Sequence, residues 1–127
     1  MLYVKYKDRE LECATTLRVA YLIQGQHNHK PYTEIFENVG NMTVEQQIGI
    51  IYAAVKAKNK DLDIRLGDFV NEYLDTYDLG TLMEQIKEII SGIMGKEITL
   101  EAENAATEGD AEEENFQSID PGIISLE

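Results

Sequence analysis

The strongest constraint on the fold is the stretch IGIIYAAV at residues 48–55, which is apolar on nearly every face if it is helical. Thr43 and Gln46 precede it in the S/T-x-x-E/Q spacing of a capping box, whose side chains satisfy backbone N–H groups where a helix begins. The alanines, the cap and the length favour a helix over a buried strand. A helix that is apolar all round is surrounded by other helices, so we predict a helix over 44–58 at the centre of a small bundle.

Two shorter helices are predicted before this central one. Thr16 can cap a helix that ends near Gly25, because glycine is favoured just past a helix C-terminus. Pro31 suits the first turn of the next helix, where its missing N–H costs nothing, and that helix leads to Gly40. The apolar positions of the two helices are Leu17, Ala20, Tyr21 and Ile23, and then Ile35, Phe36 and Val39.

Two amphipathic helices are predicted after the central one. The first carries an apolar stripe from Leu66 to Tyr77 and ends before Gly80. Thr81 with Glu84 then repeats the capping-box spacing at the start of the second. Its broad apolar face ends before a glycine and includes Leu82, Met83, Ile86, Ile89, Ile90, Ile93 and Met94.

The N-terminal residues have the pattern of strands. Leu2, Val4 and Tyr6 alternate with polar or exposed positions, and the polar KDRE at 7–10 separates them from a second extended stretch, LECAT, at 11–15. This alternation predicts a short β-hairpin. The fold class is therefore mainly α, a small helical bundle of four to five helices with a short N-terminal β-hairpin.

The acidic residues are concentrated at the C-terminal end of the sequence. The chain has 24 acidic and 11 basic residues, a net charge of −13, but residues 1–100 hold 15 acidic and all 11 basic residues. Such an acidic segment buries too little apolar surface to offset its ordering entropy. We predict a helical domain over 1–97 and a disordered acidic tail over 98–127. A docking role for the tail stays open, because it contains sparse apolar residues: Phe116, Ile119, Ile123, Ile124 and Leu126.

Charge and composition disfavour several classes of protein. The net negative charge repels phosphate backbones, so nucleic-acid binding is not expected. No apolar run approaches the roughly 20 residues that cross a bilayer, so no membrane insertion is expected. The single cysteine, Cys13, cannot form an internal disulfide, which is typical of an intracellular protein.

The two histidines are a weak candidate for a metal site. His27 and His29 lie in a predicted loop, and two imidazoles at this spacing hold a metal only if other ligands join them. The chain has no third histidine and one remote cysteine. We predict polar loop residues near a helix terminus and no metal site.

No catalytic grouping can be assembled from the remaining residues. Asp75 with Asp78, or Asp61 with Asp63, could bind a cation, but solvated helix faces commonly carry such pairs. The sequence has no phosphate-binding loop, nucleophile elbow or Ser/His/Asp set. We therefore expect neither an enzyme nor a cofactor.

At the level of element order, the sequence resembles the tail assembly chaperones of long-tailed phages that infect Gram-positive bacteria, including lactococcal siphophages. The resemblance covers residues 1–97 and rests on six segments in order: LYVKYKDRELECAT, LRVAYLIQG, KPYTEIFENVG, TVEQQIGIIYAAVKAKN, LGDFVNEYLDTYD and TLMEQIKEIISGIM. It is a resemblance of helix order and pattern, without an invariant catalytic motif.

This resemblance implies a protein of the host cell cytoplasm that is absent from the mature virion. Its partner would be the phage tape measure protein, whose apolar helical surface it would cover until the tail tube polymerises. The tail tube protein is a further partner that this role allows. The family also has frameshift-extended forms, and this chain resembles the short form.

We expect a partner helix to contact the apolar face near the end of the last predicted helix, in a helix-in-groove mode. Several copies would be needed to cover a long helix, which implies a homo-oligomer. The alternative is that the whole face is monomer core, since a stripe at helical spacing serves either purpose. The predicted contact residues are Ile86, Ile89, Ile90, Ile93 and Met94.

Two other classes compete with the chaperone. An acidic inhibitor that mimics DNA and binds a host enzyme would need dense carboxylates on an ordered surface, whereas most of the net charge here lies in the tail. A metal-dependent enzyme would use His27 and His29, and ranks last.

Overall fold

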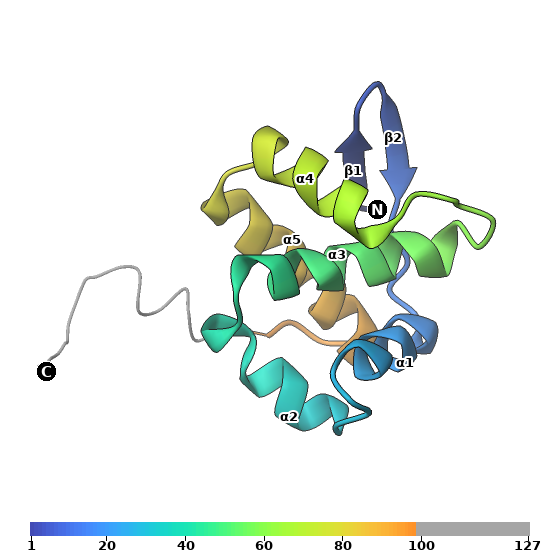
Figure 1. Cartoon of the computed structure of the whole chain (residues 1–127). Helices are drawn as coiled ribbons and strands as arrows, with labels where there is room; N and C mark the ends of the chain where they lie inside the picture. The colour runs from blue at the N-terminus through green and yellow to red at the C-terminus, as the bar shows by residue number, and fades with distance from the viewer. Residues whose placement is uncertain (99–127) are drawn as a thin grey trace, which may run out of the picture. The chain divides into compact units, whose positions relative to one another are not determined.

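The structure of this chain is a computed structural model that describes residues 1–98. Within them a β-hairpin precedes five α-helices, of which α3 lies between α1 and α4 in the view of Figure 1. The predicted mainly helical fold with an N-terminal hairpin is therefore confirmed. The elements are β1 (Tyr3–Tyr6), β2 (Arg9–Glu12), α1 (Leu17–Gln26), α2 (Tyr32–Glu37), the 3₁₀ turn η1 (Val39–Asn41), α3 (Val44–Lys58), α4 (Leu66–Thr76) and α5 (Leu79–Met94).

The chain divides into two compact units. The first comprises Met1–Phe36 and Met42–Ile98, and it contains the hairpin, α1, α3, α4 and α5. Of the second unit the structure describes only Glu37–Asn41, which includes η1. The predicted acidic tail at 98–127 lies outside the described residues except for Ile98.

Helix α3 is the centre of the first unit, as the sequence predicts. The Thr43 hydroxyl accepts a hydrogen bond from the Gln46 N–H at 3.1 Å, and Gln46 Oε1 accepts one from the Thr43 N–H at 3.0 Å. This reciprocal capping box fixes the start of the helix. Helices α1, α4 and α5 and strand β2 all pack against α3. Its buried residues are Gln47, Ile48, Gly49, Ile50, Ile51, Ala53, Ala54 and Val55.

Aromatic side chains join the hairpin to the helices. The Phe69 ring on α4 stacks with the Tyr6 ring at a centroid distance of 6.2 Å and tilts against the Tyr52 ring of α3 at 5.4 Å. The Tyr52 hydroxyl also donates to the Ile64 carbonyl at 2.6 Å. Phe69 is fully buried, so one ring couples three elements.

The hairpin is tighter than predicted. Strand β2 begins at Arg9, inside the stretch expected to be the turn, and Tyr6 pairs with Arg9. The chain reverses within two residues because Lys7 adopts a positive φ of 57°, in the left-handed region. Helix α4 then covers the β1 side: the Lys5 N–H donates to the Tyr77 hydroxyl at 2.9 Å, and the Lys7 N–H donates to Glu72 at 3.2 Å.

The observed ends of the two N-terminal helices differ slightly from the predicted ones. Helix α1 runs through Gly25 to Gln26, and the His29 N–H closes its C-terminus by donating to the Gln24 carbonyl at 2.7 Å. Thr16 is the predicted N-cap, but its side chain makes no capping hydrogen bond. The helix predicted to lead to Gly40 ends at Glu37 and is followed by η1.

The predicted start of α5 is wrong. The N-cap is Asp78, whose carboxylate accepts a hydrogen bond from the Thr81 N–H at 2.8 Å, so the predicted Thr81–Glu84 capping box does not form. Asp78 takes this place because Leu79, Gly80 and Thr81 adopt helical geometry and lengthen the helix by nearly one turn. The other end is as predicted, since Gly95 has a left-handed φ of 76° and its N–H donates to the Ser91 carbonyl.

Candidate partner-binding surfaces

The apolar face predicted to bind a partner is mostly core. Ile86, Ile89 and Ile90 are almost completely buried, because α5 packs this face against α3. Ile93 is half-buried and Met94 is 39% exposed, so only these two of the five predicted residues are accessible. Three of the five predicted contact residues are therefore inaccessible to a partner in this fold. A partner contact by Ile93 and Met94 stays a prediction.

The accessible end of α5 lies next to the start of α1. A Cβ atom built on Gly92 would be only 2.5 Å from the Thr15 Cβ, which shows how closely the two segments approach. Figure 1 shows the orange end of α5 beside the blue beginning of α1. Surface residues at the start of α1 and at the end of α5 are therefore neighbours in the fold.

The start of α1 exposes large apolar side chains to solvent. Leu17 is 80% exposed and Tyr21 is 65% exposed, and their spacing of four residues places them one turn apart on one face. The opposite face carries Val19 and Ile23, which are fully buried. We call Leu17, Arg18 and Tyr21 the α1 surface; the Arg18 guanidinium carbon lies 5.4 Å from the centre of the Tyr21 ring. An exposed apolar pair of this kind is typical of a contact site when it is not isolated.

The α1 surface also differs in charge from the rest of this acidic chain. Residues 13–33 contain no Asp or Glu, although the chain has 24 of them. Arg18 and Lys30 are the charged residues of that stretch. The α1 surface is therefore apolar with a basic edge.

A second exposed apolar pair lies where α4 meets α5. Leu74 is 50% exposed in the last turn of α4, and Leu79 is 62% exposed at the first position of α5. Asp75 and Asp78 are exposed between them. Residues 66–86 contain five acidic residues and no Lys or Arg. We call Leu74, Asp75, Asp78 and Leu79 the acidic corner.

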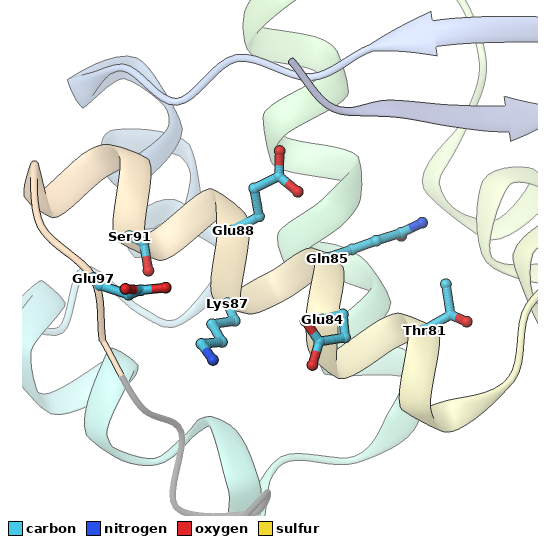
Figure 2. Close-up of a pocket in the computed structure, with 7 residues that line it drawn as sticks. All are labelled: Thr81, Glu84, Gln85, Lys87, Glu88, Ser91 and Glu97. Atoms are coloured by element: carbon cyan, nitrogen blue, oxygen red, sulfur yellow. The ribbon is translucent and has the colours of Figure 1, made fainter.

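A polar groove runs along α5. Figure 2 shows its side chains, and its volume is about 350 Å³. Gln85 is buried and its Oε1 already accepts a hydrogen bond from the Tyr73 hydroxyl at 2.5 Å. Burial raises the pKa of Tyr73, so this hydroxyl remains a donor at neutral pH. The groove therefore offers carboxylates but no activated nucleophile among its lining residues, which are Thr81, Glu84, Gln85, Lys87, Glu88, Ser91 and Glu97.

The two histidines and Asp78 lie at helix ends. His27 follows the last residue of α1, and His29 has a left-handed φ of 62° in the same helix terminus. Residues 1–98 contain no group of three His, Cys, Asp or Glu side chains that could hold a metal ion. Asp78 serves as the α5 cap, and the Thr81 backbone N–H lowers the pKa of its carboxyl group.

The lone cysteine is not poised for reaction. Cys13 is buried, and its burial, with the nearby charges of Glu88 and Glu12, raises the pKa of its thiol to about 12. The thiolate is the reactive form, and it is scarcely populated at neutral pH.

Comparison of this chain with protein-family models, with curated protein sequences and with solved structures finds no match. Within residues 1–98, none of the helices has the length and apolar character needed to span a membrane. Three exposed residues that the sequence assigned to apolar faces now stand out, Leu17, Tyr21 and Leu74, and the structure adds Leu79.

Proposed function

We propose that this protein is a tail assembly chaperone that binds the tape measure protein of a long-tailed phage and keeps its apolar helical surface covered until the tail tube polymerises. The protein would act in the host cell cytoplasm and be absent from the mature virion. The proposal is supported by the order of predicted helices, in which the sequence resembles this family, and by one structural observation.

That observation is the exposure of Leu17 and Tyr21 on the α1 surface. The bundle already has a core of its own around α3, so these side chains are not needed to complete it. Burying apolar side chains of this size on binding gains roughly 25 cal/mol per Å² of area removed from water. A surface that favours an apolar partner is what a chaperone for an apolar helix requires.

The shape of the surface suits a helical ligand. Leu17 and Tyr21 form a ridge along α1, and Met94 lies on the last turn of α5, which approaches α1 at Gly92. A partner helix with apolar residues at i, i+3 or i+4 can pack along such a ridge. Met94 belongs to the contact face predicted from the sequence and is exposed at this end of α5.

The test is co-expression of the full chain with the tape measure protein of the same genome, followed by size-exclusion chromatography with light scattering. We expect the tape measure protein to become soluble and to co-elute with several copies of this chain. A tape measure protein that remains in the pellet while this chain elutes alone would contradict the function.

A matched pair of variants locates the contact. Leu17→Glu and Val44→Glu both replace an exposed aliphatic residue at the first position of a helix, where a carboxylate is favourable. Leu17→Glu should abolish co-elution, and Val44→Glu should preserve it. Equal behaviour of the two variants would show that the α1 surface is not the contact site.

The acidic inhibitor that mimics DNA has less support. Such a protein would present carboxylates across the surface that meets its target. Here the most exposed apolar pair lies in residues 13–33, which contain no carboxylate side chain. Binding of the chain to a host DNA-processing enzyme, unaffected by Leu17→Glu, would favour the inhibitor over the chaperone.

A further inference from the structure

The charged group of the α1 surface is a cation that a bound partner has to meet. Leu17 and Arg18 precede Tyr21 by four and three residues, so both side chains are neighbours of Tyr21 on the helix. The Arg18 guanidinium carbon lies 5.4 Å from the centre of the Tyr21 ring. A partner that covers Leu17 and Tyr21 therefore also lies against Arg18.

Arg18 has no ion-pair partner within residues 1–98. The stretch that surrounds it, residues 13–33, contains no Asp or Glu. Glu12 directly precedes that stretch, but its carboxylate lies 3.7 Å from the Lys58 ammonium group. The positive charge of Arg18 is therefore available to a partner.

The neighbouring end of α5 does not compensate this charge. Residues 89–98 contain one basic residue, Lys96, and one acidic residue, Glu97. Both side chains are exposed. The two charges offset each other, so Arg18 determines the sign of the charge beside the exposed apolar pair.

A partner that covers this surface removes water from the Arg18 guanidinium. A charged group that loses its hydration is costly unless an opposite charge replaces the water. The planar guanidinium suits a carboxylate, to which it can donate two parallel hydrogen bonds. We propose that the α1 surface selects helices in which a Glu or Asp lies one turn from the apolar residue that packs on Leu17 and Tyr21, and rejects helices with Lys or Arg at that position.

This inference rests on the proposed function for the identity of the partner, because it specifies which segments of the tape measure protein are covered. Apolar helical segments flanked by carboxylates would be bound, and segments flanked by basic residues would be left to other proteins. Such a site discriminates by repulsion of the wrong partner as well as by attraction of the right one.

The selectivity is opposite in sign to that expected from the net charge. A chain with a net charge of −13 repels an acidic peptide and attracts a basic one unless a local group decides the contact. At physiological ionic strength the screening length is about 8 Å, so a charge in contact with the peptide outweighs distant ones. A preference for the acidic peptide therefore identifies a local cation.

The experiment measures the binding of two labelled synthetic peptides to the full-length chain by fluorescence anisotropy. Both peptides are alanine-rich, about 20 residues long so that they form helices, and blocked at both ends. Both carry the same leucines one turn apart. One peptide has Glu one turn beyond the leucines, and the other has Lys there. Circular dichroism checks that the two peptides are equally helical.

Arg18→Glu is the decisive variant, and Arg9→Glu is its matched control. Both replace an exposed arginine by glutamate, so they change the net charge equally. Arg9 begins β2, and Figure 1 shows the turn of the hairpin pointing away from α1. Arg18 lies in the first turn of α1, where a carboxylate is favourable, so the fold is preserved.

We expect the unaltered chain and Arg9→Glu to bind the Glu peptide at least about tenfold more tightly than the Lys peptide. Arg18→Glu should reverse this order, because its carboxylate repels the Glu peptide and attracts the Lys peptide. Added salt should reduce the difference between the peptides in all three proteins.

Three results would overturn the inference. The first is an unaltered chain that binds both peptides equally or prefers the Lys peptide. The second is a preference for the Glu peptide that persists in Arg18→Glu. The third is an unaltered chain that binds neither peptide although it keeps the co-expressed tape measure protein soluble, because the partner would then be recognised elsewhere.

Failure of the proposed function gives a different result. The unaltered chain would bind the Glu peptide selectively while the co-expressed tape measure protein stays in the pellet. The selectivity of the α1 surface would then stand, and its partner would be another apolar helix flanked by carboxylates.

Discussion

Helices α1 and α5 both carry apolar residues at helical spacing, but they differ in how many of these residues are buried. Helix α5 buries Ile86, Ile89 and Ile90 against α3, whereas α1 leaves Leu17 and Tyr21 in solvent. Helix α5 is also fixed by a side-chain cap at Asp78, while Thr16 provides none to α1. Apolar periodicity identifies both helices, but only packing decides which apolar side chains complete the core and which stay exposed to solvent.

The largest effect that would test this comparison is expected at Ile89. Ile89→Asp buries a carboxylate without a partner in the core, which should cost at least about 4 kcal/mol and unfold the chain. Thermal unfolding followed by circular dichroism measures it. A folded Ile89→Asp variant would restore the predicted partner-binding role of this α5 face.

The second-largest effect on stability is expected at Gly92, where α5 approaches the segment just before α1. Within a helix, Gly→Ala usually stabilises by roughly 0.5–1 kcal/mol. At Gly92 the added Cβ would lie 2.5 Å from the Thr15 Cβ, so the backbone has to shift and we expect a net loss of about 1–3 kcal/mol.

Urea denaturation of Gly92→Ala, of Thr15→Gly and of the double variant tests whether the loss of stability comes from a clash with Thr15. The double variant should lose much less than the sum of the two single losses, because Thr15→Gly removes the atoms that clash. Additive losses would show that α1 and α5 do not meet at this point.

A smaller effect is expected at the α5 cap. The Thr81 N–H lowers the pKa of Asp78 in the folded protein, so Asp78 contributes stability above its unfolded pKa of about 4 and loses that contribution as the pH falls through its folded pKa. Asp78→Ala should therefore lower the melting temperature at neutral pH, and the difference should shrink below about pH 4.

Two variants serve as references for the cap. Asp78→Asn keeps a capping oxygen without a titrating charge, so its melting temperature should follow that of Asp78→Ala in pH dependence but lie above it. Thr16→Ala should change the melting temperature little, since Thr16 makes no capping hydrogen bond. A large drop in the melting temperature of Thr16→Ala would show that α1, like α5, is stabilised by a side-chain cap.

The smallest effect on stability is expected on the α1 surface. Leu17→Glu and Tyr21→Ala change exposed side chains, so each should alter the free energy of unfolding by no more than about 0.5 kcal/mol. Urea denaturation measures it. A loss comparable to that of Gly92→Ala would mean that these side chains stabilise the monomer and are not kept for a partner.

Much of the fold follows from the sequence because its strongest signals are local. The capping box at Thr43 and Gln46 and the apolar residues after it place α3 from Val44 to Lys58, as observed. Gly95 ends α5 through its left-handed backbone, again as predicted. These features depend on neighbouring residues and need no knowledge of the tertiary structure.

The predictions from sequence are wrong where two capping signals compete for one helix start, or where tertiary packing decides which face of a helix is buried. Asp78 and Thr81 are both good capping residues three positions apart, and the sequence does not show that Leu79 and Gly80 join the helix. Similarly, Leu17 and Tyr21 look like core positions until Val19 and Ile23 are seen to occupy the core side of α1. The absence of carboxylates from residues 13–33 is the sequence signal that could have marked this surface.

The hydrogen bonds that α4 makes to the hairpin have a consequence for crowded conditions. A strand edge with free N–H and C=O groups is a template for pairing with other chains, and this is a common start of aggregation. On β1 the Tyr77 hydroxyl occupies the Lys5 N–H, and the Glu72 carboxylate occupies the Lys7 N–H in the adjoining turn. This edge of β1 is therefore less open to a strand of another molecule, even at high protein concentration.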